Sequence, residues 1–384
     1  MAGPSPIAVP YRPVARVLTV LLLLFGVLVG VKALGEGFEQ LGDGTLEVIF
    51  AATQNPFIGL IVGILATTVV QSSSVTTAMI VGLVAAPESP LPLANAVPMV
   101  MGANIGTTVT ATFVSLAHMG RRDEFERAFP VAVCHDLFNY VTVLALLPLE
   151  LMTGYLQQTA VTVAGVLQDV GGFDYDSPLS AVLEATLVPI EQFLAWLLGS
   201  PVLQGIAFVL IAGVLIFSTL FLLVQVMRSL VHTRVERLVT NVLGSSAILS
   251  ILVGAVITVM VQSSSITTSL LVPLGAAGLL RVEQALPVTI GANIGTTVTA
   301  LLAALAVSGP NAVFGLEIAL VHLLFNLTGM LLIYPLRVTR NVPLQAARFF
   351  TTLALRSRRL TLFWVVALFY GVPALLLFMD RLFR

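Results

Sequence analysis

The sequence predicts an all-α polytopic membrane protein made of two repeats that lie in the membrane in opposite orientations. Its 384 residues are 58% hydrophobic and only 10% charged, with a mean hydropathy of +1.03, whereas soluble domains carry about 25% charged residues. The apolar residues form long unbroken runs instead of alternating with polar ones, which excludes a β-barrel. Polar motifs inside this apolar sequence occur twice in the same order, which indicates an internal duplication.

Three pairs of motifs carry the duplication. They are Gln-Ser-Ser-Ser-(Val/Ile)-Thr-Thr at 71–77 and 262–268, Gly-Ala-Asn-Ile-Gly-Thr-Thr-Val-Thr-Ala at 102–111 and 291–300, and His-x-x-Phe-Asn at 135–139 and 322–326. The offset between copies changes only from 191 to 189 to 187 residues. Because polar groups are costly in a membrane interior, duplicated polar strings there predict the working site.

The first segment, residues 1–34, is expected to hold a cytoplasmic tail and the first transmembrane helix. Its apolar run 17–31 follows Arg12 and Arg16, as the apolar part of a signal peptide would. Lys32 and Gly-Glu-Gly follow the run instead of a small-residue cleavage site. We therefore interpret the run as a retained helix.

Clusters of arginine predict the topology. Besides the one before the first helix, they lie at 121–127, 228–237 and 337–359. The positive-inside rule places all of them in the cytoplasm, and it places the acidic, Arg-free stretches 35–47 and 150–200 outside. Repeat one, 35–150, then enters its Gln-Ser-Ser-Ser motif from outside, and repeat two, 228–336, enters from inside. Inverted repeats are typical of secondary transporters, whose binding sites lie near the bilayer midplane.

The apolar stretches beside each Gln-Ser-Ser-Ser motif are too short to cross a membrane. Residues 57–70 and 75–86 number 14 and 12, while a spanning helix needs about 20. We predict a re-entrant or broken helical hairpin with the motif near its tip, and a matching hairpin from 247–261 and 269–280. Such backbone occurs at membrane depth only where it lines a polar cavity or packs against protein.

The remaining segments complete the expected architecture. Residues 151–202 are an extracytoplasmic loop, 203–227 a linking transmembrane helix, and 337–384 a cytoplasmic basic segment with the last transmembrane helix. Cys134 is the single cysteine, which excludes an internal disulfide. The net charge of -1 does not favour a nucleic-acid partner. No paired carboxylates, metal-ligand spacing or nucleotide-binding loop occur, so we expect neither an enzyme nor an ATP-driven pump.

The duplicated motifs can hold an anion and cations together. A broken helix offers free backbone N–H groups and a positive dipole end, which with hydroxyls can bind an anion without Lys or Arg. Carbonyl oxygens at helix C-termini, with Ser and Thr hydroxyls, suit Na⁺. The expected anion ligands are Gln71, Ser72, Ser73, Ser74, Asn104, Gln262, Ser263, Ser264, Ser265 and Asn293. The expected Na⁺ ligands are Gln71, Ser74, Thr76, Thr107, Gln262, Ser265, Thr267 and Thr296.

Two features admit a structural and a functional interpretation. The motif glycines either let a ligand approach the backbone or let helices pack closely; they are Gly102, Gly106, Gly291 and Gly295. Asp136 has no counterpart in repeat two, where Leu323 stands. It either forms an ion pair with a nearby arginine on the cytoplasmic side or belongs to the site.

Taken together, these motifs resemble the type II sodium/phosphate cotransporter family over nearly the whole chain. Phe-x-Arg-Ala-Phe at 125–129 and Tyr334-Pro335 belong to the same resemblance. The resemblance implies a symporter that imports inorganic phosphate with Na⁺ by alternating access, with Na⁺ as coupling ion and no other cofactor. It implies substrate and sodium sites at the two Gln-Ser-Ser-Ser regions and Asn139. We expect a multi-pass protein of the plasma membrane (the inner membrane of a bacterium), in contact with lipid, with a cytoplasmic N-terminus, and a homodimer with functional protomers.

The chain departs from the family pattern at one sodium site. Electrogenic members have Asp where this chain has Arg121 and Gln where it has His118. With the positions of Thr112 and Asn139, these are associated there with an additional Na⁺. A guanidinium would repel Na⁺, so we expect this site to be lost and transport to be near-electroneutral. Arg121 then either occupies the lost site or is a cytoplasmic residue that sets topology.

Two alternatives stay open at this point. One is a Na⁺-coupled transporter of another oxyanion such as sulfate or arsenate, because hydroxyls and helix dipoles recognise tetrahedral oxyanions generally. The other is a non-transport membrane channel or scaffold, which the inverted duplication favours less.

Overall fold

A computed structural model describes residues 13–41, 53–86, 90–171, 178–242, 246–307, 309–371, 373–375 and 378. Within these ranges all elements are helical, and five helices are long and apolar enough to cross a membrane. The prediction of an all-α polytopic membrane protein is confirmed. The predicted N-terminal tail before Pro13 and residues 42–47 of the predicted loop lie outside the described residues, whereas residues 35–41 of that loop are helical and end α1.

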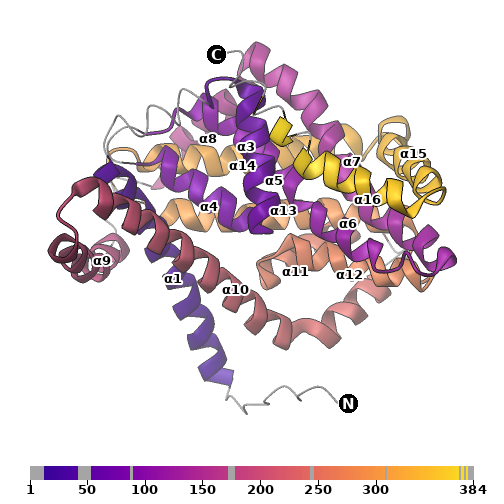
Figure 1. Cartoon of the computed structure of the whole chain (residues 1–384), viewed down its shortest axis with the longest axis horizontal. Coiled ribbons are helices and arrows are strands. Elements are labelled where there is room, and N and C mark those ends of the chain that lie inside the picture. The colour runs from indigo at the N-terminus through magenta and orange to yellow at the C-terminus, as the bar shows by residue number, and fades with distance from the viewer. Residues whose placement is uncertain are drawn as a thin grey trace.

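Two long helices form one side of the molecule (Figure 1). α1 (Pro13–Leu41) and α10 (Pro201–Val242) pack against each other. Gly30 of α1 lies at their contact, where an added Cβ would come 2.6 Å from the Ile216 side chain. α10 contains the predicted linking helix 203–227 and continues as a helix into the third arginine cluster.

The stretch 151–202, expected as a loop, carries two helices, α8 (Tyr155–Gly171) and α9 (Pro178–Leu197). α8 begins where Gly154, at φ +62°, ends the preceding helix. Leu156, Ala160 and Ala164 lie four residues apart on α8 and are fully buried in the main core. This one-face pattern is the sequence signal for α8, whereas the charge rule that placed the stretch outside carries no information on helicity.

Each Gln-Ser-Ser-Ser motif joins two short helices. α3 (Pro56–Val70) leads into α4 (Ser73–Val84), and α11 (Ala247–Val261) leads into α12 (Ser264–Ala276). α3 begins at Asn55, whose side chain accepts a hydrogen bond from the backbone N–H of Phe57 at 3.0 Å. The helix breaks are where the sequence predicts them, although α12 begins five residues before the predicted 269.

Each of these pairs packs against a longer helix that carries the second motif. α5 (Leu93–Thr107) lies on α3, and α13 (Val282–Ala306) lies on α11. At both contacts the backbones touch: a Cβ added to Gly102 would lie 2.0 Å from the Leu60 carbonyl oxygen, and one added to Gly291 would lie 1.9 Å from that of Ile251. The structure therefore uses these glycines for close packing.

The identical ten-residue motifs differ in one respect. In repeat one the helical hydrogen bonding lapses at Thr108 between α5 and α6 (Val109–Leu116), although Thr108 keeps helical dihedral angles and Leu93–Leu116 counts as one helix long enough to cross a membrane. In repeat two the same residues lie inside the uninterrupted α13.

The remaining helices hold the two halves together. α7 (Arg122–Thr153) contacts α12 and α13 as well as α5 and α6, and α14 (Ala312–Ile333) contacts α4 and α5 as well as α13. α15 (Arg337–Ala354) packs against α7, and α16 (Arg358–Val366) runs on into the π-helix η1 (Ala367–Gly371). α7 begins nine residues before the predicted 131, with Asp123 and Glu124 in a first turn that favours acidic residues.

Replacing Gly102 or Gly291 with alanine is expected to destabilise the protein. The new Cβ would meet a backbone carbonyl oxygen, and two packed helices can relieve such a contact only by moving apart. Overpacking of this kind costs about 1–3 kcal/mol, which should lower the thermal unfolding midpoint in detergent. Gly213→Ala in α10 is the control, because no described atom lies within 4 Å of its added Cβ. An unchanged midpoint for Gly102→Ala would contradict the close approach.

Candidate functional site

Each helix break turns at a glutamine in the left-handed conformation. Gln71 has φ 57° and Gln262 has φ 56°, and they are the non-glycine residues with positive φ among the described residues. The Gln262 amide nitrogen donates to the Val259 carbonyl at 2.7 Å, and the Gln71 amide makes the equivalent bond to the Thr68 carbonyl. A left-handed non-glycine residue is strained, and such strain clusters at functional sites.

A threonine of the second motif donates a hydrogen bond to the side chain of each glutamine. The Thr110 hydroxyl donates to the Gln71 side-chain oxygen at 3.0 Å, and the Thr299 hydroxyl donates to that of Gln262 at 2.9 Å. Thr110 and Thr299 occupy the same position of the duplicated ten-residue motif. The two repeats therefore build the same local structure from the same residues.

The three serines of each triplet have different environments. The first serine caps the following helix: the Ser72 hydroxyl accepts from the Val75 N–H at 3.3 Å, and the Ser263 hydroxyl from the Ile266 N–H at 3.4 Å. The second serine, Ser73 or Ser264, is buried, and its hydroxyl makes no hydrogen bond within the described part of the chain.

The third serine of each triplet reaches the opposite half. The Ser74 hydroxyl lies 3.5 Å from the Thr299 hydroxyl of α13, and the Ser265 hydroxyl lies 3.5 Å from the carbonyl oxygen of Thr107. Thr107 ends α5 just before the interruption at Thr108. The structure thus brings each triplet to the second motif of the other repeat.

The threonines expected as Na⁺ ligands bond to backbone carbonyls. Thr76 and Thr267 donate to the carbonyls of Ser72 and Ser263 at 3.2 Å each. The expected ligands Thr107 and Thr296 donate one turn back along their own helices, at 2.8 and 3.0 Å. Because a hydroxyl that donates to a carbonyl keeps its lone pairs, these bonds are compatible with cation coordination.

The expected anion ligands Asn104 and Asn293 are engaged elsewhere, in a buried amide cluster with Asn139 and Asn326. Asn139 donates to the Asn104 carbonyl at 2.8 Å, Asn293 donates to the Asn139 side-chain oxygen at 2.7 Å, and Asn326 donates to that of Asn104 at 3.1 Å. The pair Asn104–Asn326 and the pair Asn293–Asn139 each join the two repeats. The two pairs are equivalent, because Asn293 has the motif position of Asn104 and Asn139 has the motif position of Asn326.

The ring of one histidine and the backbone carbonyl of a second lie at this amide cluster. His135 Nε2 lies 2.6 Å from the Asn293 side-chain oxygen, and Asn326 donates to the His322 carbonyl at 3.0 Å. Both rings are buried. Asn326 and His322 were not among the expected site residues, although the repeated His-x-x-Phe-Asn motif was the signal that could have found them.

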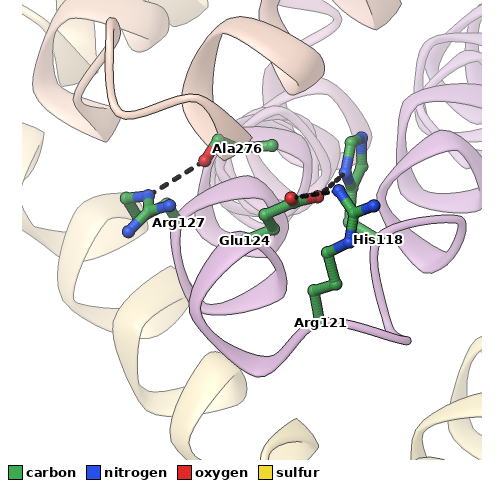
Figure 2. A network of polar contacts seen from close by, with 5 residues as sticks. All are labelled: His118, Arg121, Glu124, Arg127 and Ala276. Carbon is green, nitrogen blue, oxygen red and sulfur yellow. Dashed lines mark hydrogen bonds and ion pairs between the residues drawn. The ribbon is translucent and has the colours of Figure 1, made fainter.

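The residues expected at the lost sodium site lie in two different environments. Thr112 and Asn139 are buried, whereas Arg121 has a 79% exposed side chain. Figure 2 shows Arg121 and His118 around Glu124: the guanidinium donates to Glu124 at 2.6 Å, and His118 Nδ1 lies 3.1 Å from its other oxygen. The hydrogen bond to Glu124 raises the pKa of Arg121 above its ordinary value. In this structure the guanidinium does not occupy the place of a buried Na⁺.

Arg127, from the same arginine cluster, has a structural contact. Its guanidinium donates to the Ala276 carbonyl, the last residue of α12, at 3.0 Å (Figure 2). A cation at a helix C-terminus meets the negative end of the helix dipole. This contact ties the start of α7 to the second hairpin.

Asp136 does not form the ion pair with arginine that was one of its two interpretations. Its side chain is buried, and one carboxylate oxygen accepts from the Thr112 hydroxyl at 2.8 Å. The other oxygen has no hydrogen-bond partner among the described residues. The three arginines of the nearby cluster include Arg121 and Arg127, which pair with Glu124 and Ala276 instead.

Comparison with known proteins gives one family. The model of the family described as Na+/Pi-cotransporter matches residues 24–164 and 214–357. The chain is 34% identical to the sodium-dependent phosphate transport protein 2A of Rattus norvegicus over 90% of its own length, and 28% identical to the 2B protein of Homo sapiens over 94%. It spans 63% and 65% of these relatives, less than two thirds of each. No solved structure gives a significant match.

Replacing Asn139 with leucine is expected to lower stability, because it leaves the Asn293 amide and the Asn104 carbonyl without partners. Each buried group left unpaired costs about 1–3 kcal/mol. The thermal unfolding midpoint in detergent should fall clearly. Thr186→Val is the control, since it removes an exposed hydroxyl bond within α9. A midpoint equal to that of the unmodified protein would show that the amide cluster does not hold the halves together.

Proposed function

The chain belongs to the Na+/Pi-cotransporter family, and we propose that it is a Na⁺-coupled symporter that imports inorganic phosphate by alternating access. The relatives are named as sodium-dependent phosphate transport proteins. The observation that carries the proposal is the pair of Gln-Ser-Ser-Ser junctions. Each presents a helix N-terminus with the free hydroxyl of a buried serine and contacts the other repeat.

Phosphate would bind at these two N-termini. The first N–H groups of α4 and α12 have no acceptor within their own helices, and the positive end of each dipole favours an anion. Ser73 and Ser264 supply hydroxyls that no described residue uses. Gln71 and Gln262 hold the turns in shape through their bonds to Thr110 and Thr299 and the helix ends. Asn104 and Asn293 would support the site through the amide cluster.

Na⁺ would bind where carbonyl and hydroxyl oxygens meet. The Thr107 carbonyl at the interruption of α5 faces the Ser265 hydroxyl, and the Ser74 hydroxyl faces Thr299. Thr76, Thr267 and Thr296 add hydroxyl oxygens. Oxygen ligands at the ends of broken helices are the usual sodium sites of secondary transporters.

Alternating access would come from the two repeats. We infer that repeat one (35–150) and repeat two (228–336) lie in opposite orientations, as their flanking charges predict. The pairs Asn104–Asn326 and Asn293–Asn139 join the repeats through equivalent positions. This symmetry supports the inference, because two related units that pair with each other can rock between two equivalent arrangements.

Transport would be near-electroneutral. Arg121 and His118 replace the Asp and Gln that the family resemblance associates with an additional Na⁺ site, and Glu124 holds their side chains away from the buried Thr112 and Asn139. With one Na⁺ fewer per divalent phosphate, little net charge would cross. The membrane potential would then not contribute its ~2.3 kcal/mol per charge per 100 mV.

The proposed setting is a plasma membrane, the inner membrane in a bacterium, with the N-terminus in the cytoplasm and a homodimer of functional protomers. Phosphate and Na⁺ are the partners, Na⁺ is the coupling ion, and the protein is not an enzyme.

Labelled phosphate uptake into proteoliposomes should require an inward Na⁺ gradient and should not respond to voltage. The protein would be compared under an inward Na⁺ or K⁺ gradient, with the potential clamped at zero or made negative inside. Uptake that grows with negative potential would discard the near-electroneutral stoichiometry and keep the symporter. Arsenate should compete and sulfate should not; uptake of sulfate instead would indicate another oxyanion. No Na⁺-dependent uptake by folded protein would overturn the assignment.

Ser73→Ala and Ser264→Ala should each abolish phosphate uptake while changing the free energy of unfolding by no more than about 0.5 kcal/mol. The hydroxyls make no described hydrogen bond, so their loss should remove ligands without removing structure. Ser218→Ala is the matched control, because that hydroxyl bonds within α10 at the Leu215 carbonyl. Full uptake by both serine variants would move the phosphate site away from the triplets.

A further inference from the structure

α15 lies at one edge of the molecule, beside the ends of three helices that can cross a membrane (Figure 1). It follows α14 after residues 334–336. Its Arg348 contacts Glu283 in the first turn of α13, and its last residue, Ala354, shares a core cluster with Phe125 in the first turn of α7. α15 itself is not among the helices apolar enough to span. In a bilayer it would therefore run along the surface, past the ends of α7, α13 and α14.

α15 packs on protein along one side and exposes apolar side chains along another. Leu344 and Ala347 are buried in a core cluster shared with α7. Val338, Val342 and Phe349 are 81%, 47% and 61% exposed. Spacings of four and seven residues place these three on one face of a helix. At the surface of a bilayer such a face would rest among acyl chains, as it does in interfacial helices.

The same segment is strongly basic. Residues 337–359 contain six arginines and no acidic residue. Two of the arginines are engaged by neighbours, Arg340 by the ring of Tyr334 and Arg348 by Glu283. Three more are exposed, and their side chains make no hydrogen bond or ion pair with a described residue; they are Arg337, Arg356 and Arg359. These three guanidinium groups are therefore free to bind an anion.

We propose that α15 and the start of α16 bind anionic phospholipid of the cytoplasmic leaflet, with Arg337, Arg356 and Arg359 on the headgroup phosphates and Val338 and Phe349 among the acyl chains. The arginine clusters predict that this surface is cytoplasmic, and the cytoplasmic leaflet is the anionic one. A guanidinium suits the headgroup because it can donate two parallel hydrogen bonds to one phosphate group. Each arginine near an anionic surface strengthens binding about fivefold.

Anionic lipid fits this surface better than a second copy of the chain or free phosphate. A two-fold contact would place the same basic segment on both sides, and residues 337–359 have no acidic residue to balance it. Inorganic phosphate has the charge of the headgroup but no hydrocarbon to cover Val338 and Phe349. The inference requires only that the chain lies in a membrane, so it holds whatever the chain transports.

The test reads lipid contact from the two tryptophans of the chain, Trp196 and Trp364. Trp364 lies on α16, five residues after Arg359, and is 57% exposed, while Trp196 lies on α9 and is 80% exposed. The full chain, as Trp196→Phe or as Trp364→Phe, would be reconstituted into vesicles of phosphatidylcholine and phosphatidylglycerol, one of the two with brominated acyl chains. Quenching of the remaining tryptophan gives the affinity of phosphatidylglycerol relative to phosphatidylcholine at each place.

We expect phosphatidylglycerol to be preferred about fivefold at Trp364, with no preference at Trp196. Raising the salt concentration should weaken the preference, because salt screens exposed charges. Arg356→Gln and Arg359→Gln should each at least halve it. Arg121→Gln is the matched control: Arg121 is an exposed arginine that is already paired with Glu124, so its loss should leave the preference unchanged.

Thermal unfolding in detergent tests the three arginines together. Short-chain phosphatidylglycerol should raise the unfolding midpoint more than short-chain phosphatidylcholine does, because a ligand that binds only the folded protein stabilises it. The chain that combines Arg337→Gln, Arg356→Gln and Arg359→Gln should lose this difference. Inorganic phosphate should affect this chain and the unmodified one equally; a gain from inorganic phosphate that the triple replacement removes would make this a site for the free ion.

Two further results would overturn the proposal. Equal lipid preference at Trp364 and Trp196 would show that α15 selects no headgroup, and a preference kept in both Arg356→Gln and Arg359→Gln would exclude these arginines. The comparison of the two lipids at the two tryptophans needs no change of an arginine, so it decides the matter even where an arginine variant does not fold.

Discussion

The structure depends on one constraint: a polar group placed at membrane depth must find a partner inside the protein. The amide cluster of Asn104, Asn139, Asn293 and Asn326 meets most of this constraint by pairing each repeat with the other, although the Asn326 side-chain oxygen has no partner among the described residues. An asparagine has donors and an acceptor, so two related asparagines can satisfy one another without a charge. This cluster fixes α5, α7, α13 and α14 relative to one another, and the two helix breaks are positioned by these helices.

The same constraint explains why the glycines and the left-handed glutamines occur together. A helix break exposes carbonyl and N–H groups, and the structure satisfies part of them with the glutamine side chain itself and part with the cap from Ser72 or Ser263. The neighbouring helix must then come close enough for Thr110 or Thr299 to reach the glutamine. Gly102 and Gly291 permit that approach, because any side chain there would meet a backbone carbonyl. What remains unsatisfied at each break is the helix N-terminus and one serine hydroxyl.

The sequence predicts the helix breaks well because their cause is local. Stretches of 14 and 12 apolar residues beside Gln-Ser-Ser-Ser are too short to span a bilayer, and the structure ends its helices there. The sequence could not predict the interruption at Thr108, because the identical residues continue as one helix in α13. The ion pair of Arg121 with Glu124 differs from this case, because the i, i+3 spacing of the two residues indicates it.

The two repeats are equivalent in their amides and glutamines but not in charge. Repeat one carries Asp136 where repeat two carries Leu323, and it is repeat one whose helix is interrupted beside Thr112, the donor to Asp136. A buried carboxylate with one unpaired oxygen is costly, and leucine at the same position of the other repeat shows that the helix pairing does not need it. Asp136 therefore marks the point at which the two repeats differ in charge, on the buried face of α7 beside Thr112.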